Sequence, residues 1–220
     1  MIDWAVAPKK TAYLNIDLQN VFVEGYSISS PNGPAVVAQA NRLAAVCRKA
    51  GILVIHTAQE TRADGANRGI ASEIVGAYLA SHNMSRGGIT AGSDAVRLSP
   101  RLHVAPSDVV LVKPRYGAFT GTDLDLILRA KGIDTVIIGG IATNVCCDTT
   151  AREAAMRDYK VFFLSDGTGN RGLADLSADQ VKAAVLATLE FAFAQVITVD
   201  AMIAKIEAAA GALAAPRQGP

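Results

Sequence analysis

Six short apolar runs, spaced along 220 residues and separated by helical patterns, constrain the fold of this chain most. Each run is continuously apolar and does not alternate with polar residues, which is typical of strands that are buried on both faces of a sheet. Alternation of such strands with helices predicts a parallel sheet. We therefore predict a single α/β domain over residues 1–220, with a six-stranded parallel sheet and helices on both of its faces. The expected strands are Thr11–Ile16, Ile52–Thr57, Val109–Val112, Thr135–Ile138, Val161–Leu164 and Val196–Val199.

Helical patterns fill most of the segments between these runs. Two expected helices end in a basic residue followed by a glycine, at Lys49 before Gly51 and at Lys131 before Gly132. The segment 60–106 is less regular and rich in glycine, so we expect loops there, of the kind that often form lids or subunit contacts. Residues 213–220 are expected to form a flexible tail. The expected helices are Ala35–Ala50, one near Ile70–Ser81, Gly121–Lys131, Asn144–Arg157, Ala178–Phe193 and Ala201–Ala212.

Composition excludes several classes of partner. The net charge is +1, which gives no electrostatic basis for binding nucleic acid or an acidic membrane. Three cysteines do not make a disulfide framework, and this fits a reducing compartment. The N-terminus lacks the basic-then-apolar pattern of a signal peptide, and no apolar run reaches the ~18 residues of a membrane span. We expect a cytoplasmic protein that acts on a small molecule.

The best candidate nucleophile is Cys146. It follows an expected strand and the Gly139-Gly140 bend, at the start of an expected helix. Backbone N–H groups and the helix dipole at such a place favour a thiolate with a lowered pKa, and they can also hold an oxyanion. A cysteine is more often a small buried apolar residue, and we interpret Cys47 and Cys147 in that way.

Two charged residues follow other strands at the same edge of the predicted sheet. Asp17 comes directly after the first strand and Lys113 directly after the third. Ligands of open α/β sheets bind beyond the carboxyl ends of the strands, where Cys146 is also expected. Each charge alone would be an ordinary cap or a solvated side chain. Together with a thiol, an aspartate can transfer protons and a lysine ammonium can stabilise negative charge.

The three histidines, His56, His82 and His103, are scattered and lack the spacing of metal ligands. His56 ends the second expected strand and could line the site, although a hydrogen-bonded core role is favoured for a lone histidine. We therefore expect no metal and no cofactor.

Taken together, these motifs resemble the isochorismatase-like cysteine hydrolase family over Thr11 to about Lys205. The resemblance implies a Rossmann-like six-stranded sheet, an Asp17–Lys113–Cys146 catalytic triad, and C–N bond hydrolysis through an acyl-thioenzyme. It also implies a cis peptide between Ile141 and Ala142, and an oxyanion hole made by the N–H groups of Ala142 and Cys146. The motifs that carry the match are Asp17–Asn20, Lys113–Phe119, Leu124–Arg129 and Gly140–Cys146, extended by Thr150, Ala151, Arg152 and Asp166.

Two differences from known branches of the family reduce the number of branches that the chain can resemble. Nicotinamidases carry an additional histidine-containing metal motif near the end of the second strand, which His56–Asp64 does not match, and true isochorismatases lack a cysteine at the position of Cys146. The remaining branch acts on small amides and ureides, and the chain looks most like ureidoacrylate and biuret-type amidohydrolases. The residues expected to contact the substrate are Gln19, Phe22, Tyr116, Ile141, Thr143 and Asn144.

The leading hypothesis is therefore a metal-independent amidohydrolase of a small ureide or carbamoyl compound. Another small amide, such as maleamate or N-carbamoylsarcosine, is an alternative substrate, and a non-catalytic ligand-binding protein is a second class. The resemblance suggests a homo-oligomer, either a dimer or a tetramer. The arginines considered for holding a substrate carboxylate are Arg62, Arg68, Arg86 and Arg115.

Overall fold

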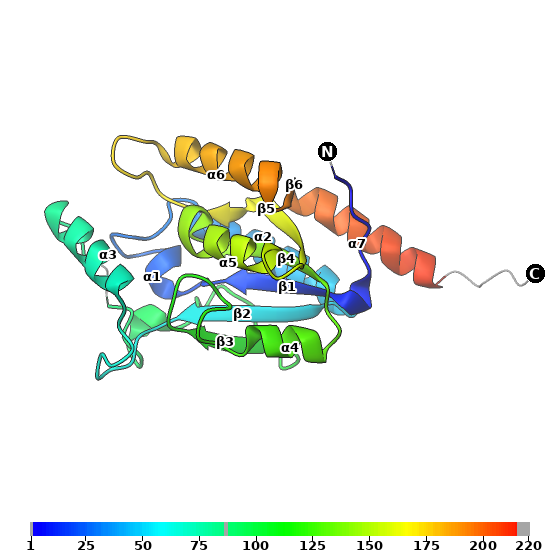
Figure 1. Cartoon of the computed structure of the whole chain (residues 1–220), viewed down its shortest axis with the longest axis horizontal. Coiled ribbons are helices and arrows are strands. Elements are labelled where there is room, and N and C mark those ends of the chain that lie inside the picture. Colours follow the sequence, from blue (N-terminus) through cyan, green and yellow to red (C-terminus); the bar gives the residue numbers. More distant parts are fainter. Residues whose placement is uncertain (1, 86–87, 215–220) are drawn as a thin grey trace, which may run out of the picture.

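The computed structural model describes residues 2–85 and 88–214 and contains one six-stranded sheet (Figure 1). Every pair of neighbouring strands is parallel, in the order β3-β2-β1-β4-β5-β6. The predicted α/β fold with a six-stranded parallel sheet is confirmed. The strands are β1 (Thr11–Ile16), β2 (Leu53–Gln59), β3 (Val109–Lys113), β4 (Thr135–Ile141), β5 (Lys160–Gly169) and β6 (Gln195–Ile197).

Helices cover both faces of the sheet, as its continuously apolar strands require. On one face, α2 (Gly33–Ala50) and α7 (Val199–Ala214) pack over a core that includes Tyr13 and Phe162. On the other face, α4 (Leu124–Ala130), α5 (Asp148–Ala155) and α6 (Ala178–Ala192) enclose a second core. The predicted helices are all present, with ends that differ by a few residues. A four-residue helix that was not predicted, α1 (Asn20–Val23), follows β1.

The strands differ from the expected ones most at β5, which continues past Leu164 to Gly169, and then at β4 and β6. β4 continues through Gly139 and Gly140, where the apolar run stops, because it passes close to the end of β1. Gly140 has φ 122°, and a Cβ there would collide with the carbonyl oxygen of Ile16. β6 ends at Ile197, before the expected Val199. Asp166 Oδ1 accepts the backbone N–H of Val199 at 2.7 Å, so this residue begins α7.

The irregular segment contains the predicted helix, α3 (Ile70–Ser81), and a short 3-10 turn over Asp94–Val96. Of α3, only Leu79 is buried, and Figure 1 shows the helix at the edge of the molecule. Of the predicted tail, residues 213–214 are the last of α7, and residues 215–220 lie outside the described part of the chain. None of the described helices is long and apolar enough to cross a membrane.

Candidate active site

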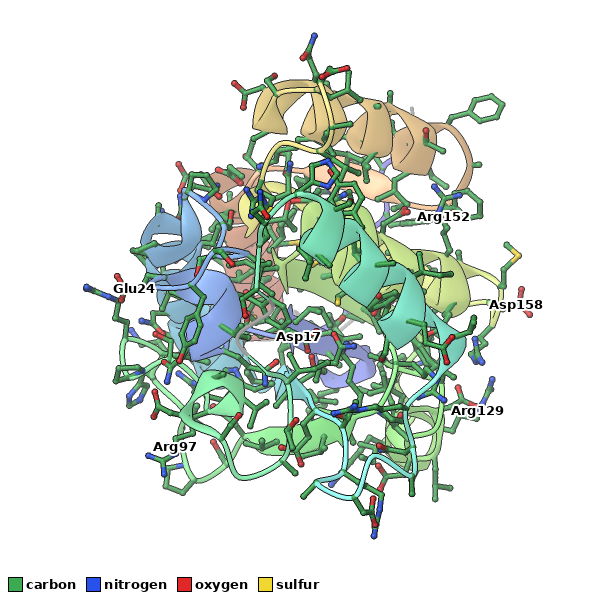
Figure 2. The ribbon with its side chains drawn as sticks, turned by 90° about the vertical axis from the view of Figure 1, so that its left-hand side faces the viewer. Asp17, Glu24, Arg97, Arg129, Arg152 and Asp158 are labelled. Atoms are coloured by element: carbon green, nitrogen blue, oxygen red, sulfur yellow. The ribbon has the colours of Figure 1, made fainter. Side chains whose placement is uncertain are left out.

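Asp17 and Lys113 form an ion pair at the carboxyl edge of the sheet. Lys113 Nζ lies 2.7 Å from Asp17 Oδ2, and both side chains are fully buried. Figure 2 shows Asp17 near the centre of this face, with the other labelled charged residues towards its periphery. Burial alone would lower the pKa of Lys113, but the negative charge of Asp17, and that of Cys146 when it is ionised, raise it above the ordinary lysine value. The lysine is therefore a permanent ammonium.

The Lys113 ammonium is fixed by further hydrogen bonds. Nζ donates to the carbonyl oxygens of Arg115, at 2.9 Å, and Tyr116, at 2.8 Å. Two of the three ammonium protons are used in these bonds, and the ion pair with Asp17 Oδ2 at 2.7 Å is the third contact of Nζ. Lys113 consequently acts on a neighbouring thiol through its charge.

Thr57 holds the Asp17 carboxylate from the adjacent strand. Its hydroxyl donates to Asp17 Oδ1 at 2.6 Å and accepts the backbone N–H of Asp17 at 3.1 Å. Asp17 has φ 50°, a left-handed conformation that aspartate tolerates better than most residues. The sequence analysis did not find Thr57 as a site residue, because its role depends on the register between β1 and β2.

Cys146 lies in a single turn of π-helix, η3 (Thr143–Cys147), between β4 and α5. Its side chain is 4% exposed, and Sγ lies 3.6 Å from Gln59 Oε1, which accepts the thiol hydrogen. Gln59, at the end of β2, is a second site residue that the sequence analysis missed. The thiol therefore has a defined hydrogen-bond acceptor.

The expectation of a lowered pKa for Cys146 is wrong. Burial raises the pKa of the thiol to about 12, and the Asp17 carboxylate adds to the rise. The Lys113 ammonium and the backbone N–H of Ala142 lower it, but by less. Desolvation of the charged form exceeds both favourable effects. Cys146 is thus a neutral thiol at rest, and a base must remove its proton before it can attack.

The backbone next to the thiol contains a cis peptide between Ile141 and Ala142, at the bond where the resemblance placed it. The carbonyl oxygen of Ala142 accepts the N–H groups of Val145, at 3.2 Å, and Cys147, at 3.0 Å. These two bonds fix the turn that carries Cys146. The N–H of Ala142 interacts with the sulfur of Cys146, so it lies where a negative charge on or beside the sulfur would be stabilised.

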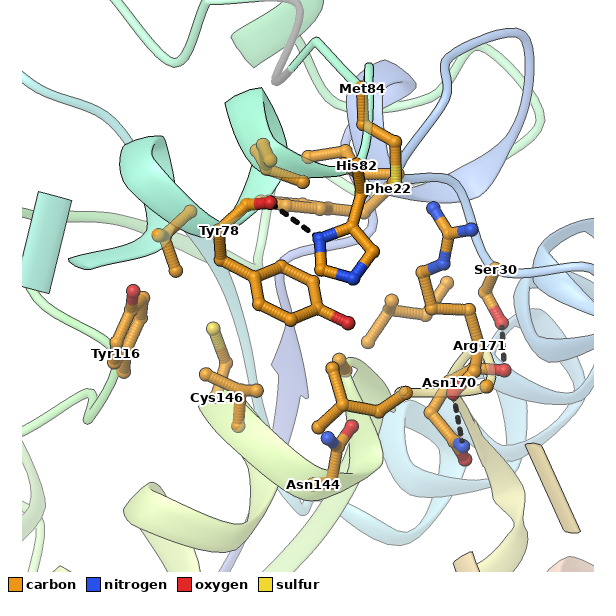
Figure 3. A pocket seen from close by; sticks show the side chains of 18 of the residues that line it. Phe22, Ser30, Tyr78, His82, Met84, Tyr116, Asn144, Cys146, Asn170 and Arg171 are labelled. Carbon is orange, nitrogen blue, oxygen red and sulfur yellow. Dashed lines mark hydrogen bonds between the residues drawn. The ribbon is translucent and has the colours of Figure 1, made fainter. Parts of the chain in front are cut away.

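A cavity of about 310 Å³ opens over Cys146 (Figure 3). Four residues that were expected to contact a substrate line it: Phe22, Tyr116, Ile141 and Asn144. Ala142 and Gln59 also line it, whereas Asp17 and Lys113 are fully buried. The thiol is therefore the member of the expected triad that an entering molecule meets.

Gln19 and Thr143, which were also expected to contact a substrate, are buried and do not line the cavity. Gln19 Oε1 accepts the N–H of Gln59, and Gln19 Nε2 donates to the carbonyl oxygens of Gln59 and Val96. Its amide extends the hydrogen bonding of β2 and thereby positions Gln59. Thr143 Oγ1 is buried and has no hydrogen-bond partner.

The arginine at the cavity is one that the sequence analysis did not consider, Arg171. Its guanidinium donates to the carbonyl oxygen of Ser27, and Figure 3 shows it beside Asn170. Arg171 follows β5 in a loop, so its position depends on the path of that loop. Of the four arginines considered, Arg62 pairs with Asp64, Arg115 donates to the carbonyl oxygens of Asn67 and Pro114, Arg68 lines a separate pocket, and Arg86 lies outside the described residues.

The other cysteines and His56 are core residues, as expected. Cys47 and Cys147 are fully buried, and burial raises the pKa of both thiols. His56 is buried between Asn15, at 3.1 Å from Nδ1, and Asp108, at 3.0 Å from Nε2. Within residues 2–85 and 88–214, no three His, Cys, Asp or Glu side chains are grouped so that they could hold a metal ion.

Comparison with known proteins identifies the family. The model of the isochorismatase domain matches residues 11–201. The chain belongs to the isochorismatase family. The cysteine hydrolase from Pseudomonas syringae pv. phaseolicola superposes with a TM-score of 0.87 at 30% identity, covering 94% of this chain and 97% of that one. The two chains therefore share the same sheet and helices over nearly their whole lengths.

Two curated relatives of this chain carry different names, although their sequence identities to it are similar. Enterobactin synthase component B of Escherichia coli is 32% identical over 179 residues, 81% of this chain and 58% of that protein. The chain therefore spans little more than half of that relative. Ureidoacrylate amidohydrolase RutB of Methylobacterium radiotolerans is 31% identical over 212 residues, 90% of this chain and 80% of that protein. Curated proteins with these two different names are thus about equally similar to this chain.

Proposed function

We propose that this isochorismatase-family hydrolase is a cysteine-dependent amidohydrolase, which cleaves the C–N bond of a linear amide through an acyl-thioenzyme. The strongest support is the buried Asp17–Lys113 ion pair, which interacts electrostatically with the Cys146 thiol at the cavity. Burying two charges is costly, and a buried ion pair is seldom the best way to stabilise a fold. Its place beside a nucleophile favours a catalytic role.

In the proposed reaction, the Asp17 carboxylate takes the Cys146 proton as the sulfur bonds to the substrate carbonyl carbon. The carbonyl electron pair moves onto oxygen, and the N–H groups of Ala142 and Cys146 stabilise that oxyanion. The tetrahedral intermediate collapses, the C–N bond breaks, and protonated Asp17 delivers its proton to the leaving nitrogen. Water, deprotonated by Asp17, then adds to the thioester carbonyl carbon; the C–S bond breaks, a carboxylic or carbamic acid is released, and Asp17 returns its proton to the Cys146 sulfur.

Lys113 serves this cycle without transferring a proton. Its three donors are occupied and its pKa is raised, so it remains charged throughout. That charge lowers the pKa of Cys146 against the effect of burial. It therefore reduces the cost of forming the thiolate at the moment when Asp17 accepts the proton.

We propose the substrate class from the resemblance of the chain to ureidoacrylate and biuret-type amidohydrolases. Ureides and carbamoyl compounds such as ureidoacrylate and biuret are the first candidates, and the name of the RutB relative agrees with the former. Maleamate and N-carbamoylsarcosine are alternatives. A purely ligand-binding protein would have no use for a proton acceptor beside a thiol.

Ammonia release from a panel of biuret, ureidoacrylate, maleamate, N-carbamoylsarcosine and simple primary amides tests this function. We expect turnover of at least one substrate by the wild type and none above background by Cys146→Ala. Mass spectrometry of the acid-quenched reaction should find an acyl adduct on Cys146. Turnover that survives in Cys146→Ala would refute the thioester mechanism, and no turnover across the panel would count against amidohydrolysis.

A further inference from the structure

The cavity over Cys146 has two parts of different character. Close to the thiol lie the amide groups of Gln59 and Asn144. Away from it, the wall is formed mainly by apolar side chains from α1, α3 and the loops around them, with the polar groups of His82 and Arg171 among them (Figure 3). We call this second part the apolar chamber, and its lining includes Phe22, Ile28, Val75, Leu79, Met84 and Leu173.

The helix α3 forms one side of the chamber. Val75, Tyr78, Leu79 and His82 all line the cavity, and their spacing of three and four residues places them on one helical face. Beside this face the helix is turned to solvent, since Ile74 is 64% exposed. The helix thus presents a row of side chains to the cavity, most of them without a charge.

Hydrogen bonds tie α3 over the cavity at both ends. Tyr116 Oη donates to the carbonyl oxygen of Ala71 at 3.3 Å, near the start of the helix. Tyr78 Oη accepts the backbone N–H of Ala174 at 3.1 Å, near its end. Tyr116 follows Lys113 by three residues, so the same loop touches the ion pair and the helix. The chamber and the thiol are therefore held in one arrangement.

Several polar groups around the chamber are already engaged within the protein. Asn170 Nδ2 donates to the carbonyl oxygens of Arg171 and Ala178, and Ser30 Oγ donates to Asn32 Oδ1. His82 Nδ1 lies 2.8 Å from the carbonyl oxygen of Tyr78, which can only accept, so this nitrogen carries the proton. Because the donors of Asn170 and Ser30 are already used, a substrate oxygen buried against them would lack a partner, at about 1–3 kcal/mol.

We propose that the substrate is an amide with an apolar body on its acyl side, and that this body lies in the apolar chamber beneath α3. This inference rests on the proposed amidohydrolase function, and within it favours an amide with an apolar acyl chain over polar ureides such as biuret and ureidoacrylate. At the roughly 30 Å³ that a water-sized group occupies in a liquid, the cavity holds about ten non-hydrogen atoms. The reacting amide accounts for about three of them, which leaves room for a short chain or an aromatic ring. The polar end of the cavity near Cys146 then binds the amide group, and the apolar chamber binds the chain or ring attached to its carbonyl carbon.

A series of primary amides of increasing chain length tests this selection. We expect kcat/KM for ammonia release to rise at least about tenfold from acetamide to hexanamide, because each added methylene is removed from water. An ether amide of the same length as hexanamide should lose most of that gain. If acetamide or biuret is turned over faster than hexanamide, the inference is overturned while the proposed function stands. If no amide or ureide is hydrolysed above the Cys146→Ala background, the proposed function itself fails.

Two neighbouring substitutions on α3 provide a matched pair. Val75→Phe fills the chamber and should lower the hexanamide-to-acetamide ratio of kcat/KM about tenfold. Ile74→Phe adds the same ring to the exposed face and should leave that ratio at the wild-type value. Val75→Ala enlarges the chamber, so it should move the preference towards octanamide, and this variant keeps the test decisive if Val75→Phe folds poorly. An unchanged ratio in both Val75 variants would show that the body does not lie beneath α3.

Discussion

The Thr57 hydroxyl bridges two groups of Asp17, the backbone N–H at 3.1 Å and the carboxylate Oδ1 at 2.6 Å. Lys113 holds the other carboxylate oxygen at 2.7 Å. Both oxygens of Asp17 are therefore held by side chains from two other strands, β2 and β3, so the carboxylate has little freedom to turn. Such fixation suits a group that must meet first a thiol proton and then a leaving nitrogen.

Thr57→Val removes this positioning and keeps the shape of the side chain. We expect kcat to fall by about 10²-fold, because small misplacement of a reacting group has effects of that size. Thr57→Ser retains the hydroxyl and should recover most of the activity. The pH profile of kcat should shift in the valine variant only. If Thr57→Val and Thr57→Ser are impaired equally, the hydroxyl does not position Asp17.

Cys146 should be the thiol that a small alkylating agent modifies in the folded protein. It lines the cavity, whereas Cys47 and Cys147 are fully buried in the core. With a pKa of about 12, its alkylation by iodoacetamide should be slow near neutral pH and should accelerate with rising pH throughout the range in which the fold survives. Peptide mapping after limited labelling identifies the site. Predominant modification of Cys147 would contradict the assignment of Cys146 as nucleophile.

The sequence predicts the site residues that lie at strand ends, and it does not predict those whose positions depend on strand register, loop path or burial. The ends of apolar runs located Asp17, Lys113 and Cys146, because parallel strands bring their carboxyl ends to one edge. Thr57 and Gln59 were missed because their partners are set by the register of β2 against β1, which no local pattern specifies. Arg171 was missed because its position depends on a loop. The sign of the pKa shift at Cys146 was wrong because burial is a property of the packed site.

Turnover should survive exhaustive chelation. The proposed mechanism uses a thiol, a carboxylate and backbone N–H groups and needs no Lewis acid. The described residues also offer no group of three metal-binding side chains. The measurement is ammonia release before and after dialysis against a chelator, with Cys146→Ala as the blank. Activity that disappears on chelation and returns with zinc or manganese would contradict a metal-free reaction.

The buried cluster of Asp108, Arg48 and His56 should make stability fall in acid. Burial opposes the charge on Asp108, but hydrogen bonds from Arg48, the Ala105 N–H and His56 lower its pKa to about 2, from 3.8. Because the folded-state pKa is the lower one, this contribution is present above about pH 4 and is lost as the pH falls towards 2. The loss should be about 2 kcal/mol. Urea unfolding between pH 6 and pH 2.5 should show this extra loss in the wild type and not in Asp108→Asn.

The two partners of the thiol should give different signatures when each is removed. Asp17→Asn keeps the shape and removes the proton acceptor, so turnover should fall by ~10²–10⁴-fold or more. Lys113→Met removes the ammonium that lowers the pKa of Cys146, so alkylation at a fixed alkaline pH should also become slower. Residues that act as one unit are strongly non-additive, and the double variant should be hardly worse than either single one. If Asp17→Asn keeps more than about a tenth of wild-type turnover, the barrier has risen by less than ~1.4 kcal/mol, which is too little for loss of the base.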